Sequence, residues 1–193
     1  MFKKSGFYVD IGAYDGIEFS NTYIFEKIGW DGFCVEANPK TFDLLKNNRK
    51  CDVYNYALSS TNDSKAKFLT STVNMLDVLE MYKTDRHENR IIRESNNNIE
   101  YIEIPTITFD ELMKNYNDID YIDFMSLDIE GGELDILKTI DFNKYSFGVI
   151  TVEINHNYEE IKQLMFSNGY KVLIENHWDL MFIKDTKIDF TLG

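Results

Sequence analysis

The chain has 193 residues and a formal net charge of −13, with 20 Lys and Arg residues against 33 Asp and Glu residues. This length fits one domain, and a hydrophobic content of 44% excludes a chain that is disordered throughout. The acidic balance argues against nucleic acid and anionic membrane surfaces as partners, because like charges repel each other.

The first half of the chain alternates short apolar runs with longer amphipathic ones. The apolar runs predict strands over residues 7–11, 32–36 and 53–58, and a further strand over residues 65–69 at a sheet edge. Apolar residues at helical spacing before Gly29 predict a helix over residues 21–28. Asn38 and Pro39 supply an N-cap and a first-turn proline, so another helix is expected to begin there.

Residues 71–98 interrupt this rhythm with many polar side chains. We expect them to form an insertion or lid, with a helix inside it, in a single domain that spans residues 1–193. The capping box at residues 108–111 predicts the start of a further helix. The remaining apolar patterns predict strands over residues 102–104, 123–129 and 148–154, helices over 133–140 and 159–167, and a terminal pair of strands over 170–174 and 179–183.

Strands that alternate with helices predict an α/β fold, in which a mostly parallel sheet is covered by helices on both faces. Sheets of this kind bind ligands at the carboxyl ends of their strands, where the strand order changes direction. The functional residues are therefore expected directly after the buried strands.

No apolar run approaches the ~18 residues that a membrane span requires, so no membrane span is expected. The first six residues lack the apolar stretch of a signal peptide. Cys34 and Cys51 show neither metal-ligand spacing nor a disulfide framework. We therefore expect a cytoplasmic protein in which both cysteines serve as small packing residues.

Residues 10–16, which follow the first strand, read Asp-Ile-Gly-Ala-Tyr-Asp-Gly. Glycine lets backbone N–H groups approach a ligand closely, but a dinucleotide site would show three glycines spaced as G-x-G-x-x-G. Only Gly12 and Gly16 are present here, and Asp10 suits a ligand with an ammonium group while it repels a pyrophosphate. The structural alternative for this segment is an ordinary turn between a strand and a helix.

Glu36 follows the second strand, where an acid can accept hydrogen bonds from both hydroxyls of an adenosine ribose. An acid at a strand end is common, so Glu36 alone is a weak signal. Together with residues 10–16, it predicts a ligand that contains adenosine.

Asp128 and Glu130 follow a later strand, and Glu153 and His156 follow the next one. Parallel strands bring these side chains to the same edge of the sheet. The carboxylates of Asp128, Glu130 and Glu153 would also supply the oxygen ligands that a divalent ion such as magnesium or calcium prefers. An ammonium group and several hydroxyls explain the same acids equally well, so we do not expect a metal.

These motifs resemble the FkbM-type S-adenosylmethionine-dependent methyltransferases. The resemblance is carried by the segments at residues 7–16, 20–27, 36–39, 55–59 and 127–138, and it covers residues 7–185. Its most specific part is the run Asp128-Ile129-Glu130-Gly131-Gly132-Glu133, which matches the family's D-x-E-G-x-E pattern.

The resemblance implies a Rossmann-like class I methyltransferase fold, with a seven-stranded, mostly parallel sheet, an antiparallel last strand and helices on both faces. It implies S-adenosylmethionine as the cofactor and methylation of a hydroxyl on a small molecule, commonly a sugar or a polyketide-type natural product, of which a sugar or glycan is the favoured acceptor. It assigns cofactor contacts to Asp10, Gly12, Ala13, Tyr14, Asp15 and Gly16 around the methionine and ribose, Asn21 at the methionine carboxylate, Glu36 at the ribose hydroxyls, Ala37, Ala57 and Leu58 along the adenine, and Asp128 near the methionine ammonium.

Methyl transfer requires above all that the acceptor oxygen lies in line with the methyl group. A sugar hydroxyl is a poor nucleophile, so a general base is expected to help. We expect His156 to be this base, with Glu130 and Glu153 as residues that position the substrate or act as alternative bases. The structural alternative for His156 is a packing role.

Four cations, Lys83, Arg86, Arg90 and Arg93, fall at helical spacing and are expected along one side of a helix. The acids between them favour a solvated face. The sharper hypothesis is a lid that attracts a phosphorylated acceptor, such as a nucleotide sugar. His177 and Trp178 could stack on a sugar ring, or pack against the protein.

Two other classes of function stay open at this point. A nicotinamide-dependent sugar-modifying oxidoreductase or epimerase is disfavoured by the missing middle glycine and by Asp10. A non-catalytic nucleoside-binding module is disfavoured by the intact acids at the strand ends. Methylation of nucleic-acid bases is opposed by the charge and by the absence of an N-P-P-Y-like or Pro-Cys motif, so no nucleic-acid partner is expected.

Overall fold

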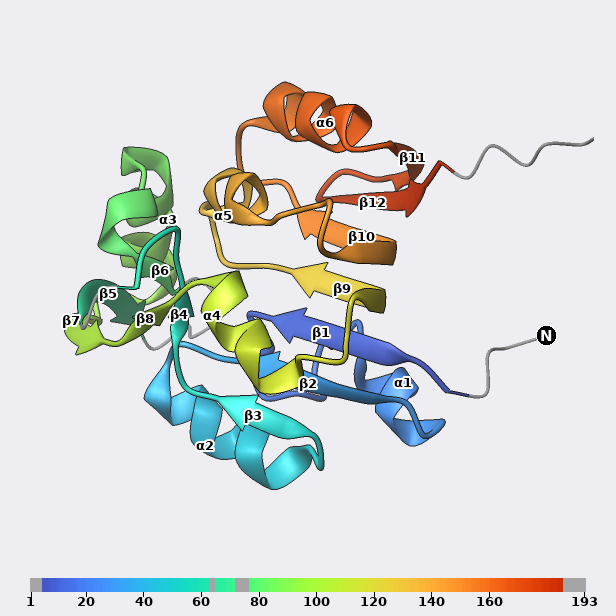
Figure 1. The fold of residues 1–193 in the computed structure, drawn as a ribbon. Coiled ribbons are helices and arrows are strands. Elements are labelled where there is room, and N and C mark those ends of the chain that lie inside the picture. The colour runs from blue at the N-terminus through green and yellow to red at the C-terminus, as the bar shows by residue number, and fades with distance from the viewer. Residues whose placement is uncertain (1–4, 63–64, 72–76, 186–193) are drawn as a thin grey trace, which may run out of the picture.

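The computed structural model describes residues 5–62, 65–71 and 77–185 (Figure 1). The strands are β1 (Phe7–Ile11), β2 (Asp31–Val35), β3 (Asp52–Tyr54), β4 (Ala57–Leu58), β5 (Ala66–Ser71), β6 (Val78–Leu79), β7 (Ile99–Ile104), β8 (Thr106–Ile107), β9 (Tyr121–Leu127), β10 (Ser146–Glu153), β11 (Tyr170–Glu175) and β12 (Asp179–Lys184). The helices are α1 (Tyr23–Lys27), α2 (Pro39–Asn48), η2 (Glu80–Tyr82), α3 (Asp85–Glu94), α4 (Phe109–Met113), η3 (Lys114–Tyr116), α5 (Glu133–Thr139) and α6 (Tyr158–Ser167). None of the helices in this part of the chain is long and apolar enough to cross a membrane.

The main sheet has seven strands in the order β11-β12-β10-β9-β1-β2-β3. The strands from β10 to β3 pair in parallel, and β12 is antiparallel to both of its neighbours. The expected mostly parallel sheet with an antiparallel last strand is therefore confirmed. The strand order changes direction between β1 and β9, which marks the carboxyl ends of these two strands as the place for a ligand.

Alternate side chains of the strands point to opposite faces of the sheet. Tyr8 and Cys34 pack with Leu45 of α2 on one face. Val9 and Phe33 belong to the larger core on the other face, which also contains apolar residues of α4, α5 and α6. Helices thus cover both faces, as expected from the alternation of strands and helices.

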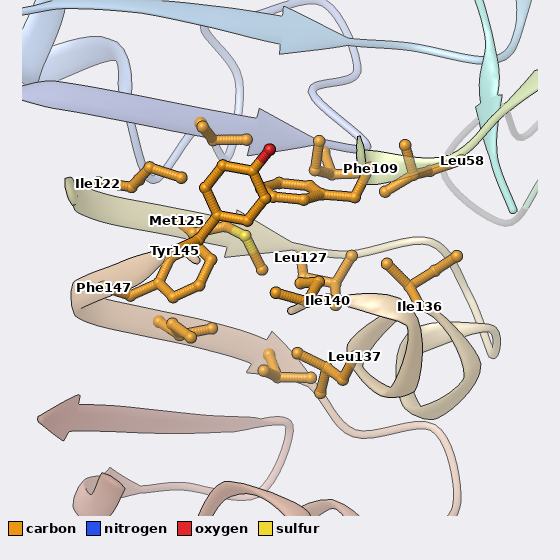
Figure 2. Packing of buried hydrophobic residues seen from close by; sticks show 14 of the residues in the cluster. Leu58, Phe109, Ile122, Met125, Leu127, Ile136, Leu137, Ile140, Tyr145 and Phe147 are labelled. Carbon is orange, nitrogen blue, oxygen red and sulfur yellow. The ribbon is translucent and has the colours of Figure 1, made fainter. Parts of the chain in front are cut away.

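The larger core lies between β9, β10 and the helices α4 and α5. Figure 2 shows Met125 and Leu127 of β9 beside Ile136 and Leu137 of α5, with Phe109 of α4 close by. Each of these five side chains is at most 2% exposed, and burying one side chain of this size contributes ~1.5–3 kcal/mol. This packing fixes the position of β9 and therefore of the loop that follows it.

The predicted strand over residues 53–58 is wrong, because the chain divides there into β3 and β4. β3 joins the main sheet, whereas β4 pairs with β8 outside it. Asn55 lies between β3 and β4, and its Nδ2 donates hydrogen bonds to the backbone oxygens of Glu36 (2.8 Å) and Ala37 (3.0 Å). These hydrogen bonds stabilise the separation of the two strands. The apolar run of this segment continues through the break, so its pattern carries no sign of it.

A second, three-stranded sheet has the order β6-β5-β7, and we call this sheet together with η2 and α3 the accessory unit. The predicted edge strand over 65–69 corresponds to β5, which lies at the centre of this sheet rather than at an edge. The helix expected within 71–98 is α3, while residues 72–76 of that segment lie outside the described ranges. In Figure 1 the accessory unit, in green, lies on the side toward which β1 and β9 point.

Asp77 joins the accessory unit to the main domain. Its Oδ2 accepts hydrogen bonds from Nδ2 of Asn38 (2.5 Å) and from Oγ1 of Thr70 (3.0 Å), and its Oδ1 accepts one from the backbone of Ser71 (3.0 Å). Asn38 is also the N-cap of α2, where its side chain accepts a hydrogen bond from the backbone N–H of Lys40. One buried amide therefore fixes both the start of α2 and the position of the accessory sheet.

The two cysteines are free and pack in the core on the α2 face. Cys34 is fully buried, and its Sγ lies 3.6 Å from the Sγ of Cys51. The packing role is confirmed, but the contact between the two thiols was not expected from their separation in the sequence.

Candidate functional site

A pocket opens at the carboxyl ends of β1, β2 and β9. It holds about 950 Å³ of empty space, including the solvent at its open mouth. The residues predicted for cofactor binding that line it are Asp10, Gly12, Ala13, Tyr14, Asn21, Glu36, Ala37, Ala57, Leu58 and Asp128. Glu130, predicted as catalytic, lines it as well.

Asp10 closes the pocket at the end of β1. The carboxyl group is 3% exposed, and its Oδ2 accepts hydrogen bonds from Oγ1 of Thr22 (2.5 Å) and Oγ of Ser20 (3.4 Å). The guanidinium of the buried Arg49 lies 3.8 Å from the same oxygen. Burial raises the pKa of Asp10 above its ordinary value, and these three partners oppose the rise.

The loop after β1 is held between the ends of β2 and β9. The backbone N–H groups of Gly12 and Ala13 both donate to the backbone oxygen of Val35, at 2.9 and 3.0 Å. Gly12 has a φ of +82°, and a Cβ atom there would lie 1.6 Å from the backbone oxygen of Asp128. Only glycine can therefore occupy this position while β9 keeps its place.

Asp15 and Gly16 do not line the pocket. The Oδ1 of Asp15 accepts hydrogen bonds from the backbone N–H groups of Ile17 (2.8 Å) and Glu18 (2.7 Å) and so shapes the following turn. Gly16 has a φ of +80° and lies against Arg49. The backbone oxygens of Asp15 and Gly16 accept hydrogen bonds from Asn48 (2.9 Å) and Arg49 (3.1 Å) at the end of α2. The cofactor contacts that the resemblance assigns to these two residues stay a prediction.

Glu36 lies at the end of β2 with its carboxyl group turned into the loops of the site. Its Oε2 accepts a hydrogen bond from the backbone N–H of Tyr14 (2.9 Å), and its Oε1 accepts hydrogen bonds from the backbone of Asn38 (2.8 Å) and Oγ1 of Thr41 (3.0 Å). Burial raises the pKa of Glu36 to about 7 in spite of these three donors. The three donors offset part of the cost of burying this acid.

Asp128 and Glu130 belong to the loop after β9. The strand ends at Leu127, two residues earlier than expected, so Asp128 is the first residue outside it. Glu130 has a φ of +58°, and Oε1 of the buried Glu133 accepts hydrogen bonds from the backbone of Ile129 (3.3 Å) and Gly131 (2.8 Å). Glu133 thus shapes the loop that presents the other two acids.

Three carboxyl groups meet at this point: those of Asp128, Glu130 and Glu153 each place an oxygen within 4.8 Å of the others. Asp128 is open to the space of the pocket but surrounded by protein, and burial together with the Glu153 carboxylate raises its pKa well above the usual range. Burial and Glu153 also raise the pKa of Glu130 to about 8. The Oε2 atom of Glu130 is buried and accepts no hydrogen bond from any described residue. A cationic ligand or a bound proton would relieve this repulsion.

A wider groove adjoins the pocket, and the two share Tyr82 and Glu130. The groove is lined by Tyr82, Thr84, Arg86, His87, Asn89, Arg90, Arg93, Glu94, Glu130, Ile154, Asn155, His156, His177 and Trp178. His156, predicted as catalytic, therefore faces the groove and not the pocket, and a Cβ atom on Gly131 would lie 2.8 Å from its Cε1. Glu153 lines neither cavity but belongs to the cluster of three carboxyl groups.

The expectation of four cations along one side of a helix is wrong for Lys83. This residue precedes α3, and its Nζ binds Oε1 of Glu88 (2.7 Å) and the hydroxyl of Tyr101 (2.9 Å). The three arginines do share the groove. Thr84 caps the helix, so the helix begins only after Lys83.

Several lining residues were not expected from the sequence. Phe68, Asp77, Leu79 and Tyr82 reach the pocket from the accessory unit. They have no local motif, since their position depends on pairing between distant strands. Ser20 and Ser126 also line the pocket, although neither was singled out within the sequence motifs that contain or adjoin them. The Nδ2 of Asn21 donates a hydrogen bond to Oγ of Ser126 (3.1 Å).

The donor set of the pocket fits S-adenosylmethionine. Its lining includes six acidic residues and, within the described ranges, no Lys or Arg; the acids are Asp10, Glu18, Glu36, Asp77, Asp128 and Glu130. Such a lining favours a ligand with a sulfonium, an ammonium group and ribose hydroxyls over a pyrophosphate. The apolar residues Ala57, Leu58, Phe68 and Leu79 offer a surface for a flat ring.

One comparison with a solved structure, at a TM-score above 0.5, agrees with this fold. The chain is similar to the methyltransferase FkbM from Methylobacillus flagellatus KT, with a TM-score of 0.55 and 15% identity, over 95% of this chain and 44% of that one. It thus spans less than half the length of that relative. It is also similar to TrmK from M. capricolum in complex with S-adenosylhomocysteine (TM-score 0.47, 14% identity, 96% of this chain and 65% of that one). A TehB-like methyltransferase from Corynebacterium glutamicum gives a TM-score of 0.48 at 10% identity, over 95% and 83% of the two chains.

No curated protein matches the chain. The model of the methyltransferase FkbM domain matches residues 10–172, which is most of the chain and contains the pocket and the loops after β9 and β10. This match selects methyl transfer over the nicotinamide-dependent and non-catalytic interpretations of the pocket. The chain belongs to the FkbM methyltransferase domain family and is an S-adenosylmethionine-dependent methyltransferase.

Proposed function

We propose that this enzyme methylates a hydroxyl group of a sugar or glycan, which binds in the groove beside the cofactor pocket. The observation that carries the proposal is the position of Glu130, whose carboxyl group lines both cavities. A substrate in the groove and a cofactor in the pocket would therefore meet at this residue. We further propose that the accessory unit is an insertion that forms one wall of the acceptor site.

The residues of the pocket would hold the cofactor as the family pattern implies. Glu36 would accept hydrogen bonds from the ribose hydroxyls, and Asp128 would face the methionine ammonium. Asp10 lies beneath the loop of Gly12, and its Oδ1 receives no hydrogen bond from the described residues, so this oxygen is free for the ligand. Bound there, S-adenosylmethionine supplies an electrophilic methyl group on sulfur.

In the transfer, the acceptor oxygen would take the methyl group, and S-adenosylhomocysteine would leave with the electron pair of the broken bond between sulfur and carbon. The hydroxyl proton must leave at the same time. Glu130 is our proposed base, because burial and Glu153 raise its pKa to about 8 and so make its carboxylate a better proton acceptor than an exposed one. His156 would then position the acceptor from the groove, although the sequence alone favoured it as the base.

The groove also has a surface suited to a sugar ring. Trp178 is 61% exposed, and its ring makes an edge contact with that of His177 at 4.7 Å between centroids. An exposed indole presents a flat apolar face with a polar rim. This wall suits a cyclic, hydroxyl-rich acceptor, and the net charge of −13 opposes a long polyanion such as nucleic acid.

The proposal is tested by incubating the protein with methyl-labelled S-adenosylmethionine and separate pools of monosaccharides, sugar phosphates, oligosaccharides, RNA and protein. Label is expected in a carbohydrate pool only. Excess EDTA is expected to leave the transfer unchanged, because we assign the three carboxyl groups to an ammonium and to hydroxyls. Transfer into RNA or protein would contradict the acceptor class, and magnesium-dependent transfer would reassign Asp128, Glu130 and Glu153 to a metal.

Binding of S-adenosylhomocysteine is expected to depend on pH through Glu36. Below about pH 7 the carboxyl group holds a proton in the empty protein. A carboxylate can accept both ribose hydroxyls, so binding favours loss of that proton and the affinity rises with pH until the group is fully ionised. Glu36→Gln imitates the protonated form, and the ratio of its Kd to that of the wild type is expected to grow across the range around pH 7. A ratio that does not vary with pH, measured by isothermal titration calorimetry, would remove Glu36 from this role.

A further inference from the structure

The charge of the lining changes sign between the two cavities. The pocket carries six acids and no basic residue within the described part of the chain. The groove carries three arginines, Arg86, Arg90 and Arg93, against two acids, Glu94 and Glu130. A concentration of guanidinium groups beside the site of a chain with a net charge of −13 suggests selection for an anionic ligand.

The arginines are presented by a helix that is fixed on its other side. Positions 86, 90 and 93 follow the i, i+4, i+7 spacing that places side chains on one helix face. Ile91 is fully buried in the apolar core of the accessory unit, and Oγ1 of Thr84 accepts a hydrogen bond from the backbone N–H of His87 (3.1 Å) to cap the helix. The orientation of the basic face toward the groove is therefore set by packing.

Most of the hydrogen-bond donors on this face are free for a ligand. Within the described residues Arg86 forms no ion pair, while Nε of Arg90 (3.2 Å) and Nη2 of Arg93 (3.3 Å) share one oxygen of Glu94. Each guanidinium group has five N–H donors. Lys83, by contrast, is fully engaged with Glu88 and Tyr101 outside the groove. Within the described residues, the three arginines are thus balanced on this helix by the single carboxylate of Glu94.

The turn that carries Trp178, which also lines the groove, is held in place as well. Oδ1 of Asn176 accepts hydrogen bonds from the backbone N–H groups of Trp178 and Asp179, both at 2.7 Å. The backbone oxygen of Trp178 accepts one from Ile154 at 2.7 Å, which ties this turn to the end of β10. The groove therefore combines an aromatic surface and a basic surface, each held in place by its own contacts.

We propose that the acceptor carries a phosphate group, which Arg86 and Arg90 bind while the sugar ring packs against Trp178. The planar fork of a guanidinium matches two phosphate oxygens at once and gives a charge-assisted, bidentate contact. This inference rests on the proposed function in one respect: a hydroxyl of the same molecule must reach Glu130. The acceptor class is thus a sugar phosphate or a sugar joined to a nucleoside diphosphate.

The test measures binding and does not depend on turnover. The protein is first saturated with S-adenosylhomocysteine, and glucose 1-phosphate, inorganic phosphate and glucose are then titrated by calorimetry. Glucose 1-phosphate is expected to bind at least about tenfold more tightly than glucose, because charge-assisted hydrogen bonds to phosphate are strong. Arg86→Gln and Arg90→Gln are each expected to weaken it about tenfold or more, and Arg86→Lys less.

Lys46→Gln is the matched control, since it removes one exposed cation from α2, away from the groove. The variants at Arg86 are expected to keep the wild-type affinity for S-adenosylhomocysteine, because Arg86 does not line the pocket. Equal binding of glucose and glucose 1-phosphate, or equal affinity in the Lys46→Gln and Arg86→Gln/Arg90→Gln proteins, would overturn the phosphate site. A wild-type protein that does not bind S-adenosylhomocysteine at all would instead contradict the proposed function.

Discussion

Replacing Glu130 by glutamine is expected to lower kcat by ~10²–10⁴-fold, the contribution that a positioned general base makes to a proton transfer. Glutamine keeps the shape of the side chain and removes the proton acceptor at the junction of the two cavities. Its effect on the Kd of S-adenosylhomocysteine is expected to be much smaller, because the adenosine contacts lie with Glu36 and the residues around it. Steady-state kinetics with the acceptor found in the pool assay, together with calorimetry, measure the two effects separately.

His156→Ala is the informative comparison. If His156 positions the acceptor, its loss raises KM more than it lowers kcat; if it is the base, the pattern is reversed. Glu153→Gln is expected to lower the pKa of Glu130, since the Glu153 carboxylate is one of the causes of its rise. The acidic limb of a pH–rate profile, where the base becomes protonated, reports this shift. Full turnover in both the Glu130→Gln and the His156→Ala proteins would exclude either residue as the base.

Gly12→Ala is expected to destabilise the protein by more than about 3 kcal/mol, beyond the usual range for overpacking. A Cβ atom at this position would lie 1.6 Å from the backbone oxygen of Asp128, so the loops after β1 and β9 cannot keep their present places. At ~2–4 °C per kcal/mol for a chain of this size, the Tm should fall by about 6–12 °C or more. Binding of S-adenosylhomocysteine should be lost as well.

Gly29→Ala provides a matched control for this experiment. Gly29 has a φ of +90°, close to the +82° of Gly12, but a Cβ atom there would meet nothing within 4 Å. Both variants therefore carry the same backbone strain of ~1–2 kcal/mol, and only Gly12→Ala adds the clash. Calorimetric melting of the two variants separates these effects. Equal Tm values would show that the close approach of the two loops does not constrain the site.

The main sheet and the pocket at the ends of its strands could be predicted from the sequence, because the patterns that indicate them lie within short segments of the chain. Apolar runs such as the segment that became β1 mark buried strands, and the residues directly after them, such as Asp10 and Glu36, must lie at the sheet edge. The match of β1, β2, β9 and β10 to the expected strands follows from this rule. The helices α2 and α4 could be predicted as well, because their N-caps, Asn38 and Thr108, are recognised from a few neighbouring residues.

The strand β5 and the helix α3 of the accessory unit could be predicted, but the pairing of its strands could not, because it depends on contacts between distant residues. β5 pairs with β7 more than thirty positions later, as in the pair Phe68 and Ile102, and nothing local specifies that partner. The same holds for Asp77, which binds Asn38 across the two parts of the chain. The groove arises only when α3 and the turn at Trp178 come together, so its basic and aromatic walls appear in the sequence as separate, ambiguous features.

The central claim is that the groove delivers a sugar hydroxyl to the cofactor pocket beside Glu130. Its most direct test is the chemical position of the methyl group after transfer from S-adenosylmethionine labelled with carbon-13 at that methyl, determined by NMR on the purified product. The account predicts a methyl ether on a sugar that carries phosphate, with no label on the phosphate itself. A labelled methyl bound to nitrogen, or label found only in RNA or protein, would contradict it.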